Sequence, residues 1–264
     1  MSKAEIQGAL WGAKAADWAE LQEPAWTPVF DQALTLAGVA AGSSVLDIGC
    51  GAGGALALAR RRGANVAGID ASANLVAIAR QRLPGARIEI GDMEELPFAA
   101  ASFDIVTGFN SFQFAADRIR AVAQASQVCR EGGTIFVLAW GKSEDCELVT
   151  MVMRHVMALL PDERSAGGVP VVDRASIEAA LLAAEIEPAE RGEFSGELVH
   201  PNADTALRAL LSAGITVRAA QIAGEARVGE VIRARLGAAT RSDGTVAFKN
   251  WFCWLKARNV APRR

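Results

Sequence analysis

Residues 45–54 read VLDIGCGAGG, an apolar run with one acidic residue that leads into a turn containing four glycines. Residues 55–61, ALALARR, follow at once and are typical of a helix, so the stretch predicts a buried strand, a tight turn and a helix. Glycines in such a turn allow backbone N–H groups to approach a ligand closely, and the helix N-terminus faces the same ligand. Because glycine-rich turns also occur without a ligand, the neighbouring sequence has to separate the two interpretations.

Strands and helices are predicted to alternate after this turn. Strands are expected at 45–48, 65–69, 87–90, 103–107 and 134–140, and helices at 54–62, 73–81 and 119–129. Such alternation predicts an α/β fold in which a doubly wound, parallel sheet is covered by helices on both faces. Ligands of these sheets bind outside the carboxyl ends of the strands, where residues 47–53, 70, 92 and 109–112 would converge.

Further helices flank this core on both sides. N-terminal helices are predicted at 11–23, ending before Pro24, and at 28–36. After residue 140 the pattern predicts a helix at 145–160, a polar loop at 162–172, a helix at 173–184, a strand at 189–200, helices at 202–213 and 219–236, and a last strand at 245–256. We expect the added helices to cover the glycine turn and its ligand as a lid.

The composition excludes several classes of protein. The chain of 264 residues carries a net charge of −3, which argues against nucleic acid as a partner because such proteins usually have a basic face. Four scattered cysteines without nearby histidines predict a reducing compartment and no metal site. The N-terminus lacks the apolar core of a signal peptide, and no run is long enough to span a membrane, so we expect a cytoplasmic protein.

Two aspartates point to an adenosine-containing ligand. Asp70 follows the second strand and can accept both hydroxyls of a ribose. Asp92 follows the third strand and offers an acceptor for an exocyclic amine, with the apolar Met93 beside it for a flat base. Aspartates at strand ends are often only loop formers, but two of them beside a glycine-rich turn favour a binding site.

The acidic residue of the first strand helps to choose the cofactor. The glycines fit both the GxGxG and the GxGxxG patterns, so they do not separate S-adenosylmethionine from a dinucleotide. Asp47, two residues before the first glycine, would repel a pyrophosphate but would suit the ammonium group of an amino-acid tail. Charge therefore favours S-adenosylmethionine, and an NAD(P)-dependent oxidoreductase remains the alternative.

Four consecutive motifs resemble those of class I S-adenosylmethionine-dependent methyltransferases. They are VLDIGCGAGG (45–54), VAGIDAS (66–72), GDMEELPFAAASFDIVTGFNSFQF (91–114) and CREGGTIFVLAW (129–140). The order and spacing are most similar to the small-molecule branch of ubiquinone- and menaquinone-biosynthesis-type enzymes, methyltransferase type 11. The chain departs from that pattern at residues 130–133, Arg-Glu-Gly-Gly, where the family commonly has Lys-Pro-Gly-Gly.

This resemblance implies a Rossmann-like fold, a cofactor and a set of cofactor-binding residues. The sheet would be mostly parallel with an antiparallel last strand, and S-adenosyl-L-methionine would be converted to S-adenosyl-L-homocysteine. We expect one domain over 1–264, with lid helices in 1–38, 141–172 and 201–240, a cofactor-binding core at 39–140, and the rest of the sheet at 173–200 and 244–258. The implied cofactor-binding residues are Asp47, Gly49, Cys50, Gly51, Gly53, Asp70, Ala71, Asp92, Met93 and Asn110.

The methyl acceptor is expected to be a small, apolar or aromatic molecule. The predicted acceptor-binding wall comprises Trp11, Trp18, Phe112, Phe114 and Trp140. Alignment of donor and acceptor in a pocket that excludes water would carry most of the reaction. His200, at the end of a predicted strand, is the first choice if a general base is needed. The protein would be a monomer or a homodimer, and a non-catalytic, S-adenosylmethionine-binding partner subunit is a further alternative.

Overall fold

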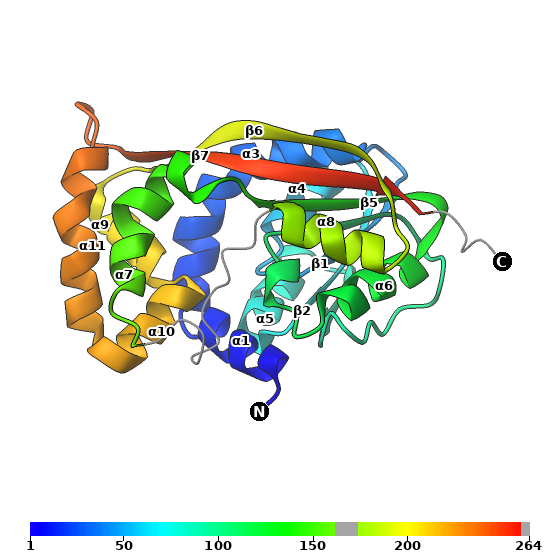
Figure 1. The fold of residues 1–264 in the computed structure, drawn as a ribbon, viewed down its shortest axis with the longest axis horizontal. Helices are drawn as coiled ribbons and strands as arrows, with labels where there is room; N and C mark the ends of the chain where they lie inside the picture. Colours follow the sequence, from blue (N-terminus) through cyan, green and yellow to red (C-terminus); the bar gives the residue numbers. More distant parts are fainter. Residues whose placement is uncertain (162–173, 260–264) are drawn as a thin grey trace.

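The computed structural model describes residues 1–161 and 174–259, and a seven-stranded mixed sheet runs through its centre (Figure 1). The strand order is β3-β2-β1-β4-β5-β7-β6. The five strands from β3 to β5 pair in parallel, whereas β7 is antiparallel to both of its neighbours. This arrangement confirms the predicted Rossmann-like sheet with an antiparallel last strand. The strands are β1 (Ser44–Ile48), β2 (Asn65–Asp70), β3 (Arg87–Ile90), β4 (Phe103–Phe109), β5 (Cys129–Trp140), β6 (Pro188–His200) and β7 (Val246–Arg258).

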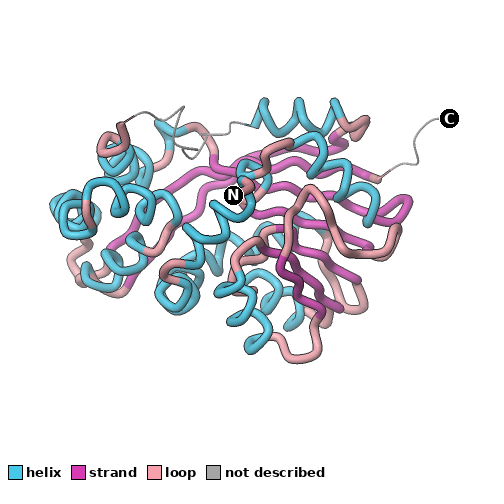
Figure 2. Tube along the Cα trace, turned by 90° about the horizontal axis from the view of Figure 1, so that it is seen from below, coloured by secondary structure: helices cyan, strands magenta, loops and turns pink. Residues whose placement is uncertain are grey.

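Helices cover both faces of the sheet, as Figure 2 shows from below. Successive residues of a strand point to opposite faces, so β1 contributes Val45 to one hydrophobic core and Leu46 and Ile48 to the other. All three are fully buried, which explains why β1 is an apolar run rather than an alternating one. The helices of the core are α4 (Gly54–Arg61), α5 (Ala73–Arg82), α6 (Arg118–Val128) and α8 (Arg174–Ala183).

The N-terminal helices differ from the prediction. The chain forms α1 (Lys3–Gly12), the short α2 (Ala15–Asp17), a π-helical segment η1 (Trp18–Gln22) and α3 (Glu23–Ala37) in almost unbroken succession. Pro24 does not end a helix, because it lies in the first turn of α3, where its missing N–H would have had no intrahelical partner. Pro28 is accommodated one turn further along the same helix.

The second group of helices lies at one end of the sheet, on the left in Figure 1. The predicted helix at 219–236 is two helices, α10 (Gly214–Ala223) and α11 (Glu225–Ala239), because Gly224 adopts φ 86° and ψ 141°, a backbone conformation available almost only to glycine. The other members are α7 (Arg154–Met157), α9 (Ala203–Leu211) and the π-helical η4 (Leu148–Met153). Residues 162–172 of the predicted lid segment lie outside the described residues.

The N-terminal helices contact both this helical group and the sheet core. Helix α1 packs on α10 and on α5, and two ion pairs, Lys14–Glu225 at 2.7 Å and Asp17–Arg208 at 2.5 Å, join the N-terminal segment to α11 and α9. Short 3-10 turns, η2 (Phe112–Phe114) and η3 (Ser143–Asp145), follow β4 and β5. Within residues 1–161 and 174–259, no helix has the length and apolar character needed to cross a membrane.

Candidate functional site

A cavity of about 250 Å³ lies at the carboxyl ends of the parallel strands. It extends from the ends of β2 and β3, past the glycine loop after β1, to the helices beyond β5. Most of the residues predicted for the site line it: Trp11, Trp18, Gly49, Gly51, Asp70, Ala71, Asp92, Met93, Asn110, Phe114 and Trp140. The strand-end rule thus identified, from sequence, the edge of the sheet at which this cavity lies.

The glycine loop is held by hydrogen bonds within the protein. Gly49, Gly51 and Gly53 have φ of 77°, 55° and 81°, in the left-handed region that favours glycine. A Cβ on Gly49 would lie 2.3 Å from the Cβ of Ser111, so the loop also needs a bare backbone there. The sequence-based expectation that its N–H groups face a ligand is not met, because every N–H from residue 49 to 53 donates to a protein oxygen.

Asp70 joins the glycine loop to the end of β2. Its Oδ2 accepts a hydrogen bond from Gly51 N at 2.9 Å, and its Oδ1 accepts one from Ser72 N at 2.8 Å. Burial raises the pKa of this carboxyl group, and the hydrogen bonds from Ser72 and Gly51 lower it. Each carboxylate oxygen can accept more than one hydrogen bond, so Asp70 has the capacity to accept hydrogen bonds from two hydroxyl groups of a ligand in the cavity.

Asp47 lies behind the loop rather than in the cavity wall. Its side chain is 2% exposed, and its Oδ1 accepts a hydrogen bond from Thr107 Oγ1 on β4 at 2.7 Å. Burial raises its pKa to about 7. The predicted contact of Asp47 with an amino group is therefore corrected to a role beneath the loop, because Asp47 does not line the described cavity and its carboxylate is buried against Thr107.

Cys50 and Gly53 are also absent from the described cavity lining. Cys50 is 5% exposed, and burial raises the pKa of its thiol well above the usual value. Gly53 faces helix α5, where a Cβ would lie 3.0 Å from Leu83 and 3.2 Å from Ala79. Both residues therefore contribute to the conformation of the loop, and neither lines the described cavity.

The segment after β4 supplies polar groups to the cavity. Asn110 adopts φ 52°, an uncommon conformation for a residue with a side chain, and lies in the wall with Ser111. Neither Asn110 Oδ1 nor Ser111 Oγ has a hydrogen-bond partner among residues 1–161 and 174–259. Two other residues of the wall, Gln22 and Trp26, likewise have a buried polar atom, Oε1 and Nε1, without a described partner. Unpaired buried polar atoms are rare in proteins, so their concentration around one cavity indicates a ligand site.

Aromatic side chains form two groups along the cavity. Near the N-terminus, the ring of Trp11 contacts Trp18 at 4.8 Å and Phe114 at 5.5 Å between centroids. Farther along, Trp26 contacts Trp140 at 5.3 Å and is stacked on Phe30 at 5.9 Å. Both arrangements give rigid apolar walls.

Phe112 was predicted in the acceptor wall, but it lies in the hydrophobic core. Its side chain is 2% exposed and packs where a Cβ on Gly108 would be only 2.3 Å from the ring. In the 3-10 turn η2, Phe114 reaches the cavity and Phe112 turns into the sheet core. Apolar character alone did not distinguish these two directions.

His200, the predicted base, is not part of the described cavity wall. It is 1% exposed at the end of β6, and neither ring nitrogen makes a well-formed hydrogen bond to another described residue. Burial lowers its pKa to about 4, and the nearby backbone of Leu21 opposes this only in part. The sequence-based choice of His200 is therefore corrected: the geometry makes it a neutral core histidine.

Several residues of the site were missed by the sequence analysis. Gly8 lines the cavity, and a Cβ there would lie 2.3 Å from the carbonyl oxygen of Ala71, so α1 packs directly on the chain after β2. Gly12, one turn later, approaches Ser72 equally closely. Gly8 lies inside α1, where glycine lowers helix stability, and Gly12 is its last residue; this spacing of four was the available signal of a close helix contact.

Comparison with known proteins agrees with the methyltransferase resemblance of the sequence motifs in the core of the chain. Residues 46–137 match the family model described as a methyltransferase domain. A malonyl-[acyl-carrier protein] O-methyltransferase from Serratia marcescens is 33% identical over 125 residues, which are 46% of this chain and 49% of that protein. The chain spans about half the length of the curated relatives that it matches.

Solved structures share the fold over most of the chain. A candidate methyltransferase from Bacillus halodurans superposes with a TM-score of 0.60 at 15% identity and covers 88% of this chain and 99% of its own. The [4+2]-cyclase SpnF superposes with a TM-score of 0.57 at 19% identity, covering 89% and 82%. Fold alone therefore does not define a reaction. The matched model covers residues 46–137, and together with the strand order it identifies this part of the chain as a methyltransferase domain.

Proposed function

We propose that this protein transfers a methyl group from S-adenosyl-L-methionine to a small, apolar or aromatic acceptor. The observation that carries the proposal is the division of one continuous cavity along the sheet. Among the described residues that line the cavity, the charged ones lie near the ends of β2 and β3: Asp70, Asp92 and Glu94. The opposite side, beyond β4 and β5, has no charged residue in its described lining and is mostly apolar and aromatic, with Ser143 as a polar residue after β5.

The cofactor would occupy the side of the cavity that holds the glycine loop. Asp70 would accept the ribose hydroxyls, and Asp92 would accept a hydrogen bond from the adenine amine, with Ala71 and Met93 against the ring. Asp92 is already fixed by a hydrogen bond from Glu94 N to its Oδ1 at 2.9 Å. The unpaired atoms of Gln22, Asn110 and Ser111 fit the polar groups of a methionine tail.

The acceptor would lie against the aromatic and aliphatic side of the cavity. Its wall comprises Trp26, Phe30, Phe109, Trp140, Leu148, Val149, Met153, Met157, Leu210, Ala213 and Ile215. None of these side chains is charged, so the described wall favours an apolar body and supplies no group to take up a proton. The sulfonium cofactor supplies an activated methyl group, and the protein would contribute alignment and exclusion of water. Trp11, Trp18 and Phe114 would close the cofactor end rather than hold the acceptor.

Binding titrations test the cofactor part of this proposal. We expect S-adenosylmethionine and S-adenosylhomocysteine to bind in calorimetric titration, and NADH not to bind. Binding of NADH alone would favour the oxidoreductase alternative instead. The absence of binding by either adenosyl compound would refute the proposal.

The acceptor can be sought with a labelled methyl group. Incubation of a metabolite extract with methyl-labelled S-adenosylmethionine, followed by mass spectrometry, is expected to reveal a labelled small molecule of low polarity. Adenosyl binding without any transferred label would favour a non-catalytic, cofactor-binding subunit.

A further inference from the structure

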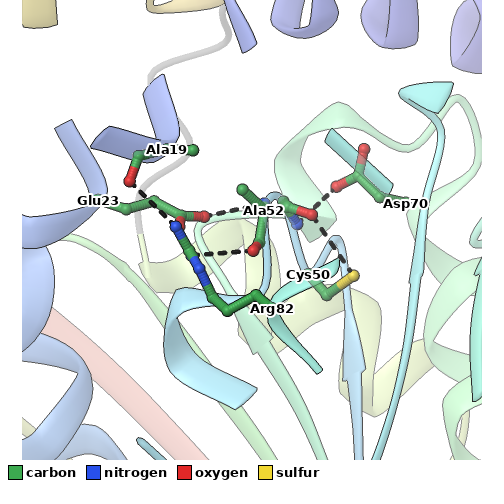
Figure 3. A network of polar contacts seen from close by, with 7 residues as sticks. Ala19, Glu23, Cys50, Ala52, Asp70 and Arg82 are labelled. Atoms are coloured by element: carbon green, nitrogen blue, oxygen red, sulfur yellow. Dashed lines mark hydrogen bonds and ion pairs between the residues drawn. The ribbon is translucent and has the colours of Figure 1, made fainter. Parts of the chain in front are cut away.

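A buried carboxylate from the N-terminal helices contacts the glycine loop from behind (Figure 3). Glu23, the first residue of α3, is 5% exposed. Its Oε1 accepts a hydrogen bond from Ala52 N at 2.9 Å, and its Oε2 pairs with Arg82 Nη1 at 2.5 Å. The residue thus links a segment that precedes the sheet to the loop after β1.

Arg82, the last residue of α5, completes the arrangement. Its Nη1 donates to the carbonyl oxygen of Ala52 at 2.9 Å, and its Nη2 donates to that of Ala19 in the π-helical segment at 3.1 Å. The pair therefore holds both the N–H and the C=O of Ala52 (Figure 3). The planar guanidinium group can make these contacts together with the ion pair, which an ammonium group cannot do in the same geometry.

The contact leaves little room for a side chain at Gly51 or Gly54. A Cβ on Gly51 would lie 3.1 Å from Glu23 Oε1, and one on Gly54 would lie 2.9 Å from Glu23 Oε2. Trp18, in the π-helical segment that Arg82 holds, lines the cavity together with Gly51. Loop shape and the position of the cavity wall are consequently fixed by the same two side chains.

We infer that Glu23 and Arg82 are positioning residues for the cofactor: their ion pair holds the glycine loop in its binding shape and fastens the N-terminal helices against it. Neither residue is in the described cavity lining, so the effect acts through Ala52 and the π-helical segment. The inference rests on the proposed binding of S-adenosylmethionine at this loop. The pair joins the buried carboxylate of Glu23 to the side chain of Arg82, which is 30% exposed, so its four contacts reach from the protein interior to the surface.

Conservative variants test the inference. Glu23→Gln keeps an acceptor for Ala52 N but removes the charge, and Arg82→Lys keeps the charge but loses the forked contacts. Asp31→Asn is the matched control, because Asp31 lies on the same helix and pairs with Arg62 at 2.7 Å without touching the loop. Calorimetry should give a dissociation constant for S-adenosylhomocysteine at least tenfold higher in the first two variants and within twofold of the unmodified protein in the control.

The outcomes separate positioning from a purely structural role. If the folded Glu23→Gln and Arg82→Lys proteins lose thermal stability but bind S-adenosylhomocysteine as tightly as the unmodified protein, the inference is refuted. If the unmodified protein does not bind S-adenosylhomocysteine, it is the proposed function that fails.

Hydrogen exchange gives a measurement that needs no variant. The amide of Ala52 should exchange as slowly as amides of the sheet core in the ligand-free protein, because its acceptor is buried. Exchange of this amide at the rate of an exposed loop would overturn the inference, even if neither variant could be purified in folded form.

Discussion

Replacement of His200 by glutamine separates a buried structural histidine from a catalytic base. The pKa of His200 is lowered to about 4 in the folded protein, against an ordinary value of about 6.5 in the unfolded chain. Between these two values the unfolded chain binds a proton that the folded protein does not, so the free energy of unfolding falls as the pH falls through this window. Above about pH 6.5 His200 is neutral in both states and contributes no pH dependence to the free energy of unfolding.

The magnitude follows from the difference between the two pKa values. At pH 5 the unfolded chain is almost fully protonated at this residue and the folded protein is not, which lowers the free energy of unfolding by about 2 kcal/mol. The full loss, below pH 4, is about 3 kcal/mol. Glutamine at position 200 has no ionisable group. Between pH 7.5 and pH 5 the free energy of unfolding of His200→Gln should therefore fall by about 2 kcal/mol less than that of the unmodified protein.

Urea denaturation at pH 7.5 and pH 5 provides the assay. The comparison variant is His155→Gln, which changes the only other histidine of the sequence. The pKa of His155 is also lowered, by desolvation and by Arg235 and Arg154, but His155 is not buried in the core as His200 is, so His155→Gln should relieve less of the loss at low pH than His200→Gln. The affinity for S-adenosylhomocysteine at pH 7.5 should be the same in all three proteins. Parallel pH profiles for His200→Gln and the unmodified protein, or loss of methyl transfer in a stable His200→Gln protein, would refute the assignment of His200 to the core.

Three other substitutions have expected outcomes. Asp70→Ala removes two charge-assisted hydrogen bonds proposed to the ribose, each worth about 1.5 kcal/mol, so calorimetry should show an affinity for S-adenosylhomocysteine lower by roughly 100-fold; an unchanged affinity would contradict the assigned site. Gly49→Ala combines left-handed backbone strain of about 1–2 kcal/mol with the collision against Ser111, whereas Gly85→Ala, at φ 81° with no described neighbour within 4 Å, has the strain alone. The melting temperature should therefore fall further for Gly49→Ala, and equal losses would show that the collision is relieved. Asp47→Asn removes a carboxyl group whose pKa is raised to about 7, so the free energy of unfolding of the unmodified ligand-free protein, taken relative to that of the variant, should fall as the pH rises from 5 to 7. Both proteins keep His200, so its contribution cancels in this difference. Urea denaturation across this range measures the difference, and parallel curves would argue against a buried, weakly acidic Asp47.

The parallel strands and the edge of the sheet that carries the cavity could be predicted from sequence. Helices α4, α5 and α6 separate the parallel strands in the sequence, except between β3 and β4, and the rule that ligands bind at carboxyl ends places Asp70 and Asp92 together. These features depend on local pattern, which a sequence displays directly. The break at Gly224 and the passage of α3 through Pro24 were missed, because tertiary packing decides whether a helix stops at such residues.

The burial of individual side chains and the ion pairs between residues far apart in the sequence could not be predicted. Phe112 and Phe114 are the same amino acid two positions apart, yet the 3-10 turn sends one into the core and the other to the cavity. Glu23 and Arg82 are separated by 59 positions, and no periodicity or motif in the sequence predicts that they form an ion pair at the glycine loop. Ion pairs of this kind emerge only from the folded arrangement of the N-terminal helices.

The hydrogen bonds of the glycine loop have a consequence for selectivity among nucleotides. Each N–H from residue 49 to 53 already has an acceptor in the protein, so an incoming phosphate would have to break an existing bond for every one of these donors that it used. A nucleotide diphosphate would therefore gain little from this loop compared with loops whose amides are free. We therefore expect phosphorylated nucleotides to bind poorly at this loop because of its folded shape, and to do so in high salt as well, where repulsion by nearby carboxylates is screened.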